Sequence, residues 1–441
     1  MTSAWVAAAT GRPLEGSVAI PGDKSVSHRA VMLASLADGV SRIEGFLEGA
    51  DTRATAAIFS QMGVRIEAPA DGVRIVHGVG IDGLRAPDAP LDCGNAGTAM
   101  RLLSGLLAAQ AFDSVLVGDD SLSQRPMQRV IEPLSAMGAR IDSDQGHAPL
   151  RIHGGQSLQG IDYALPVASA QLKSALLLAG LRAQGQTVVR EPQPTRDYTE
   201  RMLQAFGYPV DIAPGRIALR GGSRLRATDI LVPADFSSAA FFIVAAGIMV
   251  SGTISKMAGM VSGTVLRLRG VGVDPRRTGL LAVLRAMGAD IVVEPSGAGD
   301  VADIVVRAAP LHGIEVPVAW VPDMIDEFPA LCVAAACATG TTVIRGAAEL
   351  RVKESDRIAT MAVGLRTLGI RVDETPDGAV IHGGTLGGGT VESHGDHRIA
   401  MAFAVAGQVA DGEVRINDVA NVATSFPGFD ALAREVGFSL R

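Results

Sequence analysis

Apolar and polar positions along the chain follow one pattern that recurs six times. Each copy opens with a polar or charged residue at a predicted helix start. A helix of small apolar residues, a short β-like run and a second, amphipathic helix follow. The opening residues are Lys24, Asn95, Ser169, Ser237, Asp326 and Asp396. They lie between 68 (169 to 237) and 89 (237 to 326) residues apart, a period that is too long for a simple solenoid and suits a small α/β unit.

A large apolar residue followed by glycine marks the predicted end of the second helix in every copy. Glycine after the last helical turn is a natural C-cap, because it adopts the left-handed conformation without a Cβ penalty. The six pairs are Met62-Gly63, Met137-Gly138, Phe206-Gly207, Met287-Gly288, Leu368-Gly369 and Val436-Gly437. Each pair predicts a helix end that leads into a strand.

The first helix of each copy is apolar on nearly every face. The predicted segments are Ala30–Leu36, Leu102–Ala109, Ala175–Leu181, Ala239–Val250, Pro329–Ala338 and Ile399–Val405. A helix that is apolar all round has to be buried on every side. Intervening runs such as Thr187–Glu191 and Thr342–Arg345 have the pattern of short strands. We therefore expect an α/β fold of βαβαββ-like repeats with buried helices and outer sheets.

Three repeats per half predict two similar globular domains. We expect the chain to cross between them near Pro21-Gly22 and again near Pro233-Ala234. The first domain then contains residues 21–234, with repeats 1 to 3. The second contains residues 1–20 and 235–441, with repeats 4 to 6, and the strand-like Ser17–Ile20 belongs to it. We expect the active site in the cleft between the two domains.

Charge and hydropathy narrow the class of protein. The chain has 46 Asp and Glu against 39 Lys and Arg, a formal net charge of −7, which excludes a broadly basic nucleic-acid surface. With 48% hydrophobic residues and a mean hydropathy of +0.28, the chain is not expected to be disordered. The uncharged stretch Phe236–Ser255 breaks at Ser251–Thr253, which leaves an apolar core (Ala239–Val250) that is too short for a membrane span.

The remaining composition favours a cytoplasmic protein. The segment Met1–Thr10 lacks the basic and apolar regions of a secretory signal. Three cysteines, an odd number, do not make a disulfide framework, which favours a reducing compartment: Cys93, Cys332 and Cys337. The histidines do not cluster with cysteine, and His394 with His397 is a weak pair. We therefore expect no metal.

Cations gather at the predicted helix starts. Lys24 lies beside Ser25 and Arg29, which are four residues apart and share one face of a helix. Arg125 with Arg129, and Lys353 with Arg357, repeat this spacing, and Arg398 follows the start of the last apolar helix. Gly97 lets a ligand approach the backbone of another start. Helix N-termini and arginine both favour anions, so the pattern indicates a small anionic substrate; each pair alone would be an ordinary surface feature.

Two carboxylates lie among these cations. Asp326, at a predicted helix start, is either an N-cap or a catalytic group. Asp323 is a weaker rival for the same role. Glu354 lies between Lys353 and Arg357; neighbouring cations hold an acid ionised, whereas burial raises its pKa towards acid–base work. The residues alone leave these alternatives open.

The assembled motifs resemble the enolpyruvyl transferase family, and within it the second bacterial class of the branch that acts on shikimate 3-phosphate. The resemblance extends over essentially the whole chain. The motifs that carry it are Gly22–Ser25 with Arg29, Gly94–Arg101, Arg125–Met127, Ser169–Ser174, Thr195–Asp197, Arg351–Arg357, Gly395–Ala402 and Ser425–Pro427. The resemblance implies a fold of two domains with three repeats each.

The resemblance also implies a reaction and a set of site residues. The enolpyruvyl group of phosphoenolpyruvate (PEP) passes to the 5-hydroxyl of shikimate 3-phosphate, and phosphate leaves. By this resemblance the residues that hold shikimate 3-phosphate are Lys24, Ser25, Arg29, Ser169, Ala170, Gln171, Arg196, Asp326 and Lys353. Those that hold PEP are Lys24, Gly97, Arg125, Arg357 and Arg398. Catalysis falls to Asp326 as the acceptor of the hydroxyl proton, Glu354 as the donor to the PEP methylene, and Lys24.

The resemblance implies no metal or organic cofactor, a monomer without nucleic-acid or membrane partners, and inhibition by glyphosate. Gly97 leaves the PEP pocket open, where tolerant members of this class carry alanine. The chain departs from the family at Thr424-Ser425-Phe426-Pro427, where many members have Lys before Thr-Phe-Pro. One cation that contacts PEP is therefore missing.

Two alternatives remain. The sister branch, which acts on UDP-N-acetylglucosamine, shares the fold and carries a reactive cysteine on a mobile loop, but the corresponding stretch Gly118–Arg125 has none. A non-catalytic binding protein would keep the apolar helices without needing Lys24, Asp326 and Glu354 together.

Overall fold

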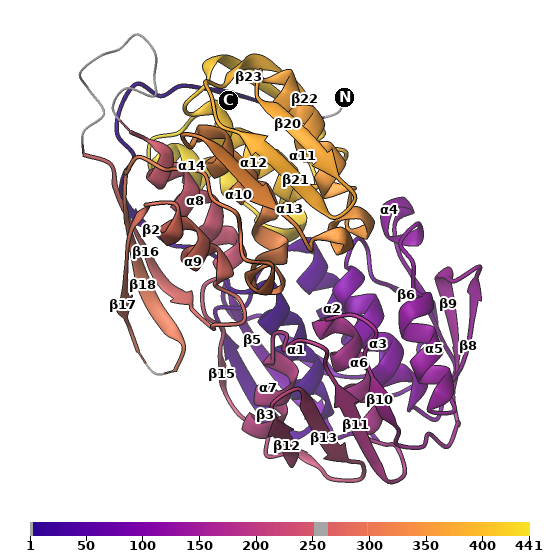
Figure 1. Cartoon of the computed structure of the whole chain (residues 1–441). Helices are drawn as coiled ribbons and strands as arrows, with labels where there is room; N and C mark the ends of the chain where they lie inside the picture. The colour runs from indigo at the N-terminus through magenta and orange to yellow at the C-terminus, as the bar shows by residue number, and fades with distance from the viewer. Residues whose placement is uncertain (1–2, 251–262, 298) are drawn as a thin grey trace. The chain divides into compact units, whose positions relative to one another are not determined.

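The computed structural model describes residues 3–250, 263–297 and 299–441. The chain divides into two compact units (Figure 1). The central unit is Gly22–Val232, and the terminal unit combines Met1–Pro21 with Pro233–Arg441.

Three buried helices form the core of the central unit: α1 (Lys24–Leu36), α3 (Gly97–Ala108) and α6 (Ala170–Gly180). Helix α3 packs against both α1 and α6. More amphipathic helices cover this core: α2 (Ala50–Gln61), α5 (Gln128–Ala136) and α7 (Tyr198–Ala205), with the short α4 (Asp120–Ser123). The apolar sequence of the first helix in each repeat thus coincides with burial on every side.

Three sheets surround these helices (Figure 1). Their strands, in spatial order, are β14 (Leu225–Arg226), β3 (Ala37–Glu44), β5 (Val73–Val79) and β4 (Arg65–Glu67), with β15 (Ile230–Leu231) also on β3; then β6 (Leu91–Asp92), β7 (Ser114–Val117), β9 (His147–His153) and β8 (Arg140–Asp144); and β10 (Asp162–Ala164), β11 (Gln186–Arg190), β13 (Arg216–Arg220) and β12 (Val210–Ala213). Each sheet joins a parallel contact at one edge to antiparallel pairs.

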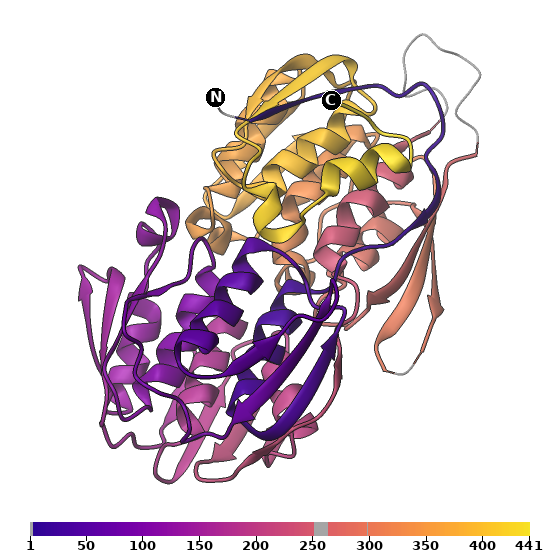
Figure 2. The same cartoon turned by 180° about the vertical axis from the view of Figure 1, so that it is seen from behind.

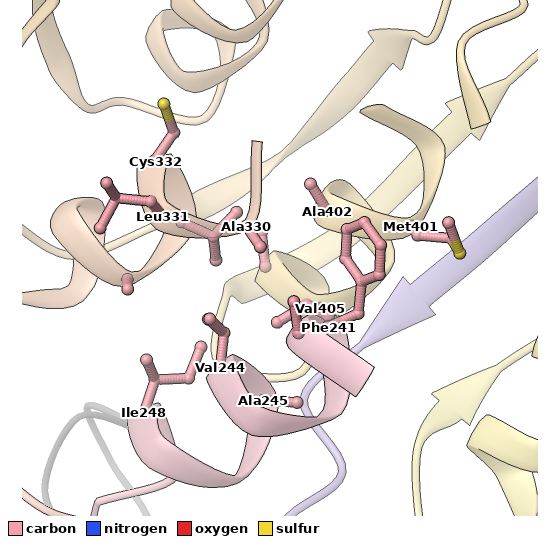
Figure 3. Close-up of a cluster of buried hydrophobic side chains, with 14 of the residues drawn as sticks. Phe241, Val244, Ala245, Ile248, Ala330, Leu331, Cys332, Met401, Ala402 and Val405 are labelled. Carbon is pink, nitrogen blue, oxygen red and sulfur yellow. The ribbon is translucent and has the colours of Figure 1, made fainter. Parts of the chain in front are cut away.

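The terminal unit repeats this plan. Its buried helices are α8 (Phe236–Ile248), α10 (Phe328–Cys337) and α12 (His397–Gly407). Its other helices are α9 (Gly279–Ala286), α11 (Arg357–Thr367), α13 (Val422–Ser425) and α14 (Phe429–Glu435), with 3₁₀ turns at η1 (Val318–Trp320), η2 (Pro322–Glu327) and η3 (Ala348–Val352). Figure 3 shows Phe241 and Val244 of α8 among residues of α10 and α12, including Ala330 and Val405.

The sheets of the terminal unit include the start of the chain. Their strands, in spatial order, are β17 (Asp290–Pro295), β18 (Val301–Arg307), β16 (Val265–Gly272) and β2 (Glu15–Val18); β19 (Thr341–Ile344), β21 (Gly378–His382) and β20 (Arg371–Thr375); and β22 (Gly387–Glu392), β23 (Asp411–Asn417), β1 (Ala4–Ala8) and β24 (Ser439–Leu440). Strand β1 lies between β23 and β24, so the indigo N-terminal segment runs among yellow C-terminal elements (Figure 2). The strand predicted at Ser17–Ile20 begins two residues earlier, at Glu15.

The predicted helix ends are confirmed. In all six pairs the apolar residue is the C-cap and the glycine has a positive φ, from +75° at Gly207 to +113° at Gly437. An L-residue with a Cβ would be strained in this conformation.

Several predicted helix starts need correction. Helix α3 begins at Gly97 rather than at Asn95. Helix α8 begins at Phe236, one residue before the predicted opening at Ser237, because the Asp235 carboxylate caps it by accepting a hydrogen bond from the Ser237 N–H at 2.7 Å. The predicted break at Ser251–Thr253 lies outside the described residues. Within the described part of the chain, no helix is long and apolar enough to cross a membrane.

Candidate active site

Lys24 opens the first buried helix of the central unit. The Asp23 carboxylate caps α1 by accepting from the Val26 N–H at 2.8 Å, which fixes Lys24 as the first helical residue. The Lys24 ammonium lies 3.0 Å from the Asp51 carboxylate of α2, and both side chains are largely buried. Sequence reasoning did not select Asp51, because it lies 27 positions away.

Arg29 is buried one turn further along α1. Its guanidinium donates to the Ser25 carbonyl at 3.0 Å, to the Ser174 hydroxyl at 2.9 Å and to the Thr199 hydroxyl at 2.7 Å. Burial lowers the pKa of Arg29 to about 10; the Glu200 carboxylate opposes this shift, and the nearby Arg196 cation adds to it. The predicted i,i+4 relation of Ser25 and Arg29 is confirmed, and two of the predicted ligands, Arg29 and Arg196, lie close together.

His28 lies between these two cations and makes the unit sensitive to pH. Its ring Nδ1 is 2.7 Å from the Thr55 hydroxyl. Burial lowers the pKa of His28 well below its ordinary value, and the charges of Lys24 and Arg29 lower it further. A depressed pKa means that the unfolded chain takes up the proton first, so stability is present above the ordinary value near 6.5 and is lost as the pH falls below it.

We expect the wild-type protein to lose about 1.4 kcal/mol more unfolding free energy than His28→Gln between about pH 7.5 and 5.5. Urea unfolding at the two pH values measures this difference. His147→Gln on β9 is the control, because it removes a histidine of the same unit whose ring contacts the Gln145 carbonyl of its own turn. Equal pH dependence of the wild-type protein and His28→Gln would contradict the assignment.

Gly97 begins α3 between two buried arginines. The Arg101 guanidinium donates to the Gln171 carbonyl oxygen at 2.8 Å, and the Arg125 guanidinium donates to the Asn95 carbonyl oxygen at 2.6 Å. A Cβ added at Gly97 would lie 3.1 Å from an Nη1 atom of each arginine. The glycine therefore leaves room beside two cations. Arg101 belongs to a recognised motif, but sequence reasoning did not select it as a site residue.

Ser169 and Ala170 begin α6. The Ser169 hydroxyl caps the helix by accepting from the Leu172 N–H at 3.3 Å, and Ala170 is the first helical residue. The Gln171 amide donates to the Thr98 hydroxyl at 2.9 Å, which links α6 to α3. The starts of these two helices are thus joined by side-chain hydrogen bonds.

Helix α6 also carries Lys173, the centre of a buried ion cluster that the sequence did not reveal. The Lys173 ammonium is 2.6 Å from the Glu200 carboxylate and 3.1 Å from that of Glu191, and all three side chains are at most 4% exposed. Burial raises the pKa of Glu200, and Lys173 opposes this shift. Glu191 also accepts hydrogen bonds from the N–H and hydroxyl of Thr195, the neighbour of Arg196. The cluster therefore fixes the segment that carries Arg196.

In the terminal unit, Arg357 lies at the centre of three carboxylates. Its guanidinium is 2.8 Å from Asp396, 2.5 Å from Glu354 and 3.5 Å from Asp326. Burial alone would lower the pKa of Arg357, but the Asp396, Glu354 and Asp326 charges raise it above its ordinary value. Its side chain is 1% exposed, whereas that of Glu354 is 20% exposed. The structure thus brings three of the predicted residues into one cluster.

Asp326 is not an N-cap. It lies within the 3₁₀ segment η2, which ends at Glu327, and α10 begins at Phe328 with Glu327 in the N-cap position. The carboxylate of Asp326 instead faces two guanidinium groups, those of Arg277 and Arg357, each at 3.5 Å. The rival carboxylate of Asp323 pairs with Arg276 at 3.5 Å. The alternative of a simple cap at Asp326 is therefore wrong.

The remaining predicted cations of the terminal unit lie at helix starts or in turns. Arg398, the second residue of α12, donates to the Asp326 carbonyl at 3.1 Å. Lys353 follows η3 and pairs with Glu349 at 3.2 Å, so it does not share a helix with Arg357, which begins α11. In the central unit Arg125 likewise precedes α5 and does not share a helix with Arg129. Spacing alone suggested helix faces that the chain does not form.

The variant C-terminal motif lies near the start of α12. The short α13 contains Thr424 and Ser425, and the Thr424 hydroxyl donates to the Asn421 carbonyl at 2.7 Å. The Asn421 amide donates to the Gly395 carbonyl at 2.8 Å. This contact ties the motif to the residue that precedes Asp396. Among the described residues, no group of three His, Cys, Asp or Glu side chains is arranged to hold a metal ion.

Comparison with known families identifies the kind of protein that carries this geometry. The family model of EPSP synthase (3-phosphoshikimate 1-carboxyvinyltransferase) matches residues 8–432. The chain belongs to the EPSP synthase family.

Related EPSP synthase sequences and structures agree over the full length. A 3-phosphoshikimate 1-carboxyvinyltransferase from Xanthomonas euvesicatoria pv. vesicatoria is 68% identical, covering 100% of this chain and 98% of the relative. The structure of EPSP synthase from Acinetobacter baumannii is 49% identical, with a TM-score of 0.86 and coverage of 100% and 99%. The enolpyruvyl transferase NikO from Streptomyces tendae, at 19% identity with a TM-score of 0.78 over 99% of this chain and 98% of that one, shares the fold.

Membership of the EPSP synthase family confirms three predictions from the sequence. These are the enolpyruvyl transferase family, the α/β fold of two domains with three repeats each, and the enzyme class. The assignment of individual residues to substrates stays a prediction.

Proposed function

We propose that this chain transfers the enolpyruvyl group of PEP to the 5-hydroxyl of shikimate 3-phosphate, releasing phosphate and forming 5-enolpyruvylshikimate 3-phosphate. The observation that carries the proposal is the cluster around Arg357, where a buried cation contacts the carboxylates of Asp326 and Glu354. The reaction needs two such acids, one for each proton transfer, and a cation for an anionic substrate.

Both substrates are multiply anionic, and the helix starts of the central unit supply matching charge. Lys24 and Arg29 on α1 bind shikimate 3-phosphate, and Ser25 adds a hydroxyl. Arg196 and the residues at the start of α6 also bind it: Ser169, Ala170 and Gln171. Lys24, Gly97 and Arg125 serve PEP. Buried guanidinium groups hold phosphate and carboxylate through paired N–H donors. This assignment is supported by the burial of Arg29 at 5% exposure and of Arg125 at 6%.

The terminal unit supplies the rest of the proposed site. Arg357 and Arg398 serve PEP, and Lys353 serves shikimate 3-phosphate. We propose that residues of both half-sites bind the two substrates. Substrates that are held in this way would displace water, which strengthens every electrostatic contact.

The chemical steps follow from where the acids lie. The 5-hydroxyl oxygen attacks C2 of PEP while its proton passes to the Asp326 carboxylate. Glu354 gives a proton to C3, which converts the methylene into a methyl group and yields a tetrahedral intermediate. The C2–O bond to phosphate then breaks, the leaving phosphate takes up the proton held by Asp326, and C3 returns a proton to Glu354 as the double bond re-forms. Lys24 stabilises the charge that develops on the leaving phosphate.

Glu354 has to be protonated before it can act as a donor, but Arg357 contacts it at 2.5 Å and favours the carboxylate. An anionic group of PEP on Arg357 would compete with Glu354 for the guanidinium. Glu354 is 20% exposed and can take up a proton from water once this contact weakens. Binding of PEP would thus prepare its own proton donor.

The test of the reaction is phosphate release from PEP with two acceptors, without added metal. We expect release with shikimate 3-phosphate and none with UDP-N-acetylglucosamine. Release only with the nucleotide sugar would assign the sister activity, and release with neither would leave the family correct and the activity wrong.

The position of Gly97 leads to a second prediction, which concerns inhibition at the same site. We propose that glyphosate inhibits the enzyme in the PEP pocket. In Gly97→Ala, a Cβ only 3.1 Å from the guanidinium groups of Arg101 and Arg125 has to displace them. Overpacking costs about 1–3 kcal/mol, so we expect the inhibition constant for glyphosate to rise roughly 5- to 150-fold. This rise should exceed that of the KM for PEP, because glyphosate is the longer molecule.

Gly247→Ala in α8, where an added Cβ meets nothing within 4 Å, is the matched control. An unchanged ratio of the two constants in Gly97→Ala would contradict this view.

We also propose that the enzyme acts as a monomer in the cytoplasm, without a metal or organic cofactor. Light scattering of the active protein tests whether it is a monomer. Dialysis against a chelator, with activity unchanged, tests whether it works without a metal.

A further inference from the structure

Arg277 is a buried cation that the family resemblance did not assign. It precedes α9 and is 3% exposed. One guanidinium nitrogen, Nη2, donates to the Ser237 hydroxyl at 2.6 Å and to the Asp235 carboxylate at 3.1 Å. The other, Nη1, lies 3.5 Å from Oδ2 of Asp326. Arg277 therefore links the start of α8 to the proposed proton acceptor.

The position of Arg277 is itself fixed by the fold. Asp235 caps α8, and Arg277 contacts that same cap. The neighbouring Arg276 points to a different partner, Asp323, and its side chain is 46% exposed. Two adjacent arginines thus serve two carboxylates of one short segment. The buried arginine faces Asp326.

The charged groups around Asp326 come from several elements. They are Arg277 before α9, Glu327 beside it in the chain, Arg357 on α11 and Arg398 on α12, with Asp235, Glu354 and Asp396 reached through these arginines. Arg357 is shared among three carboxylates. Arg277 contacts the Asp326 carboxylate and also that of Asp235, the residue that caps α8.

We propose that Arg277 is a positioning residue for Asp326, which holds Oδ2 of the carboxylate in place and keeps the group ionised so that it can accept the hydroxyl proton. This inference rests on the proposed function. If PEP draws Arg357 away from its carboxylates, Arg277 is the cation that stays with Asp326. Binding of PEP would then leave Asp326 ionised and in place to accept the proton of the shikimate 3-phosphate hydroxyl.

Removal of this charge has a defined consequence. A carboxylate beside an arginine has a pKa about 1–3 units lower than without it. In Arg277→Gln we therefore expect the acidic limb of the kcat profile to move up by about 1–3 pH units. Arg277→Lys keeps a positive charge without the planar fork, so its limb should stay near that of the wild-type protein even if kcat falls.

The matched control is Arg276→Gln, which removes an arginine one position away from a different carboxylate and should leave the limb unmoved. Because Arg277→Gln leaves Asp235 without this cation in a buried site, Arg277→Gln with Asp235→Asn is a second variant. Asparagine still caps a helix, so the double variant keeps the α8 start and isolates the effect on Asp326.

A second readout does not depend on activity. Protein labelled with ¹³C at aspartate carboxyl groups allows the Asp326 signal to be titrated, with Asp326→Asn identifying it by its absence. We expect the midpoint to rise in Arg277→Gln and in the double variant, and to stay in Arg276→Gln. An Asp326 midpoint unchanged in both Arg277→Gln variants would overturn the inference. A raised midpoint in Arg277→Gln would still support the contact if the wild-type protein released no phosphate from PEP with either acceptor. That combination would overturn the proposed function instead.

Discussion

Replacement of Glu354 by glutamine is expected to lower kcat for phosphate release by roughly 10²–10⁴-fold, the usual contribution of a positioned proton donor. Glutamine keeps the size of the side chain and an oxygen that accepts from Arg357, but it has no acidic proton to give to C3 of PEP. The KM for PEP should not rise, because Arg357 stays buried among Asp326 and Asp396 and PEP no longer competes with a Glu354 carboxylate for its guanidinium. Steady-state phosphate release measures both constants.

Two further measurements make this expectation specific to proton donation. Glu349→Gln is the control, since Glu349 pairs with Lys353 at 3.2 Å and has no part in the proposed proton transfers. In deuterated water, reversible protonation at C3 should introduce deuterium into the methylene group of PEP, and this exchange should disappear in Glu354→Gln. Exchange that continues at the wild-type rate in this variant would assign the proton donor to another residue.

Replacement of Lys173 by methionine is expected to lower the free energy of unfolding by about 3–5 kcal/mol, which is typical when one partner of a buried ion cluster is removed. Lys173 is 1% exposed and is the cation between the Glu191 and Glu200 carboxylates. Methionine fills a similar volume but leaves these two groups without their ammonium partner. Urea unfolding at neutral pH, followed by circular dichroism, measures the loss.

Two companion variants separate charge from packing. Lys173→Met with Glu200→Gln removes one of the stranded carboxylates and should recover part of the lost stability. Arg190→Gln breaks the exposed pair of Arg190 with Asp162 in the same unit, where both side chains are about half exposed, and should cost at most about 1 kcal/mol. A loss in Lys173→Met no larger than that in Arg190→Gln would show that the cluster does not stabilise the fold.

The sequence alone determined much of this architecture, because the rules involved are local. A helix such as α8, with all thirteen residues buried, can be recognised from its own apolar residues. Gly207 and its five equivalents end helices because glycine tolerates a positive φ, which depends only on the residue and its immediate neighbours. The order of the motifs was sufficient to predict the family, whose model matches residues 8–432.

The sequence did not decide where some helices begin or which residues share a helix, because the local pattern fitted more than one answer. Asp326 has the pattern of an N-cap, yet α10 begins two residues later and leaves its carboxylate to face Arg277 and Arg357. Lys353 and Arg357 have helical spacing, but the chain turns between them. A cap needs only a carboxylate at the right place, so many acids fit the pattern, and the exact helix start depends on the packing of the helix that follows.

The charge partners were decided by the tertiary structure alone. Arg277 meets Asp326 across 49 positions, and Arg357 meets Asp396 across 39. No periodicity predicts such pairs, since they form only after separate helices have packed and their starts have come together. Burial then determines what each charge does, because a group removed from water depends on its nearest partner. The sequence by itself determined which residues carry charge and which helices are buried; the tertiary structure decided which charges meet.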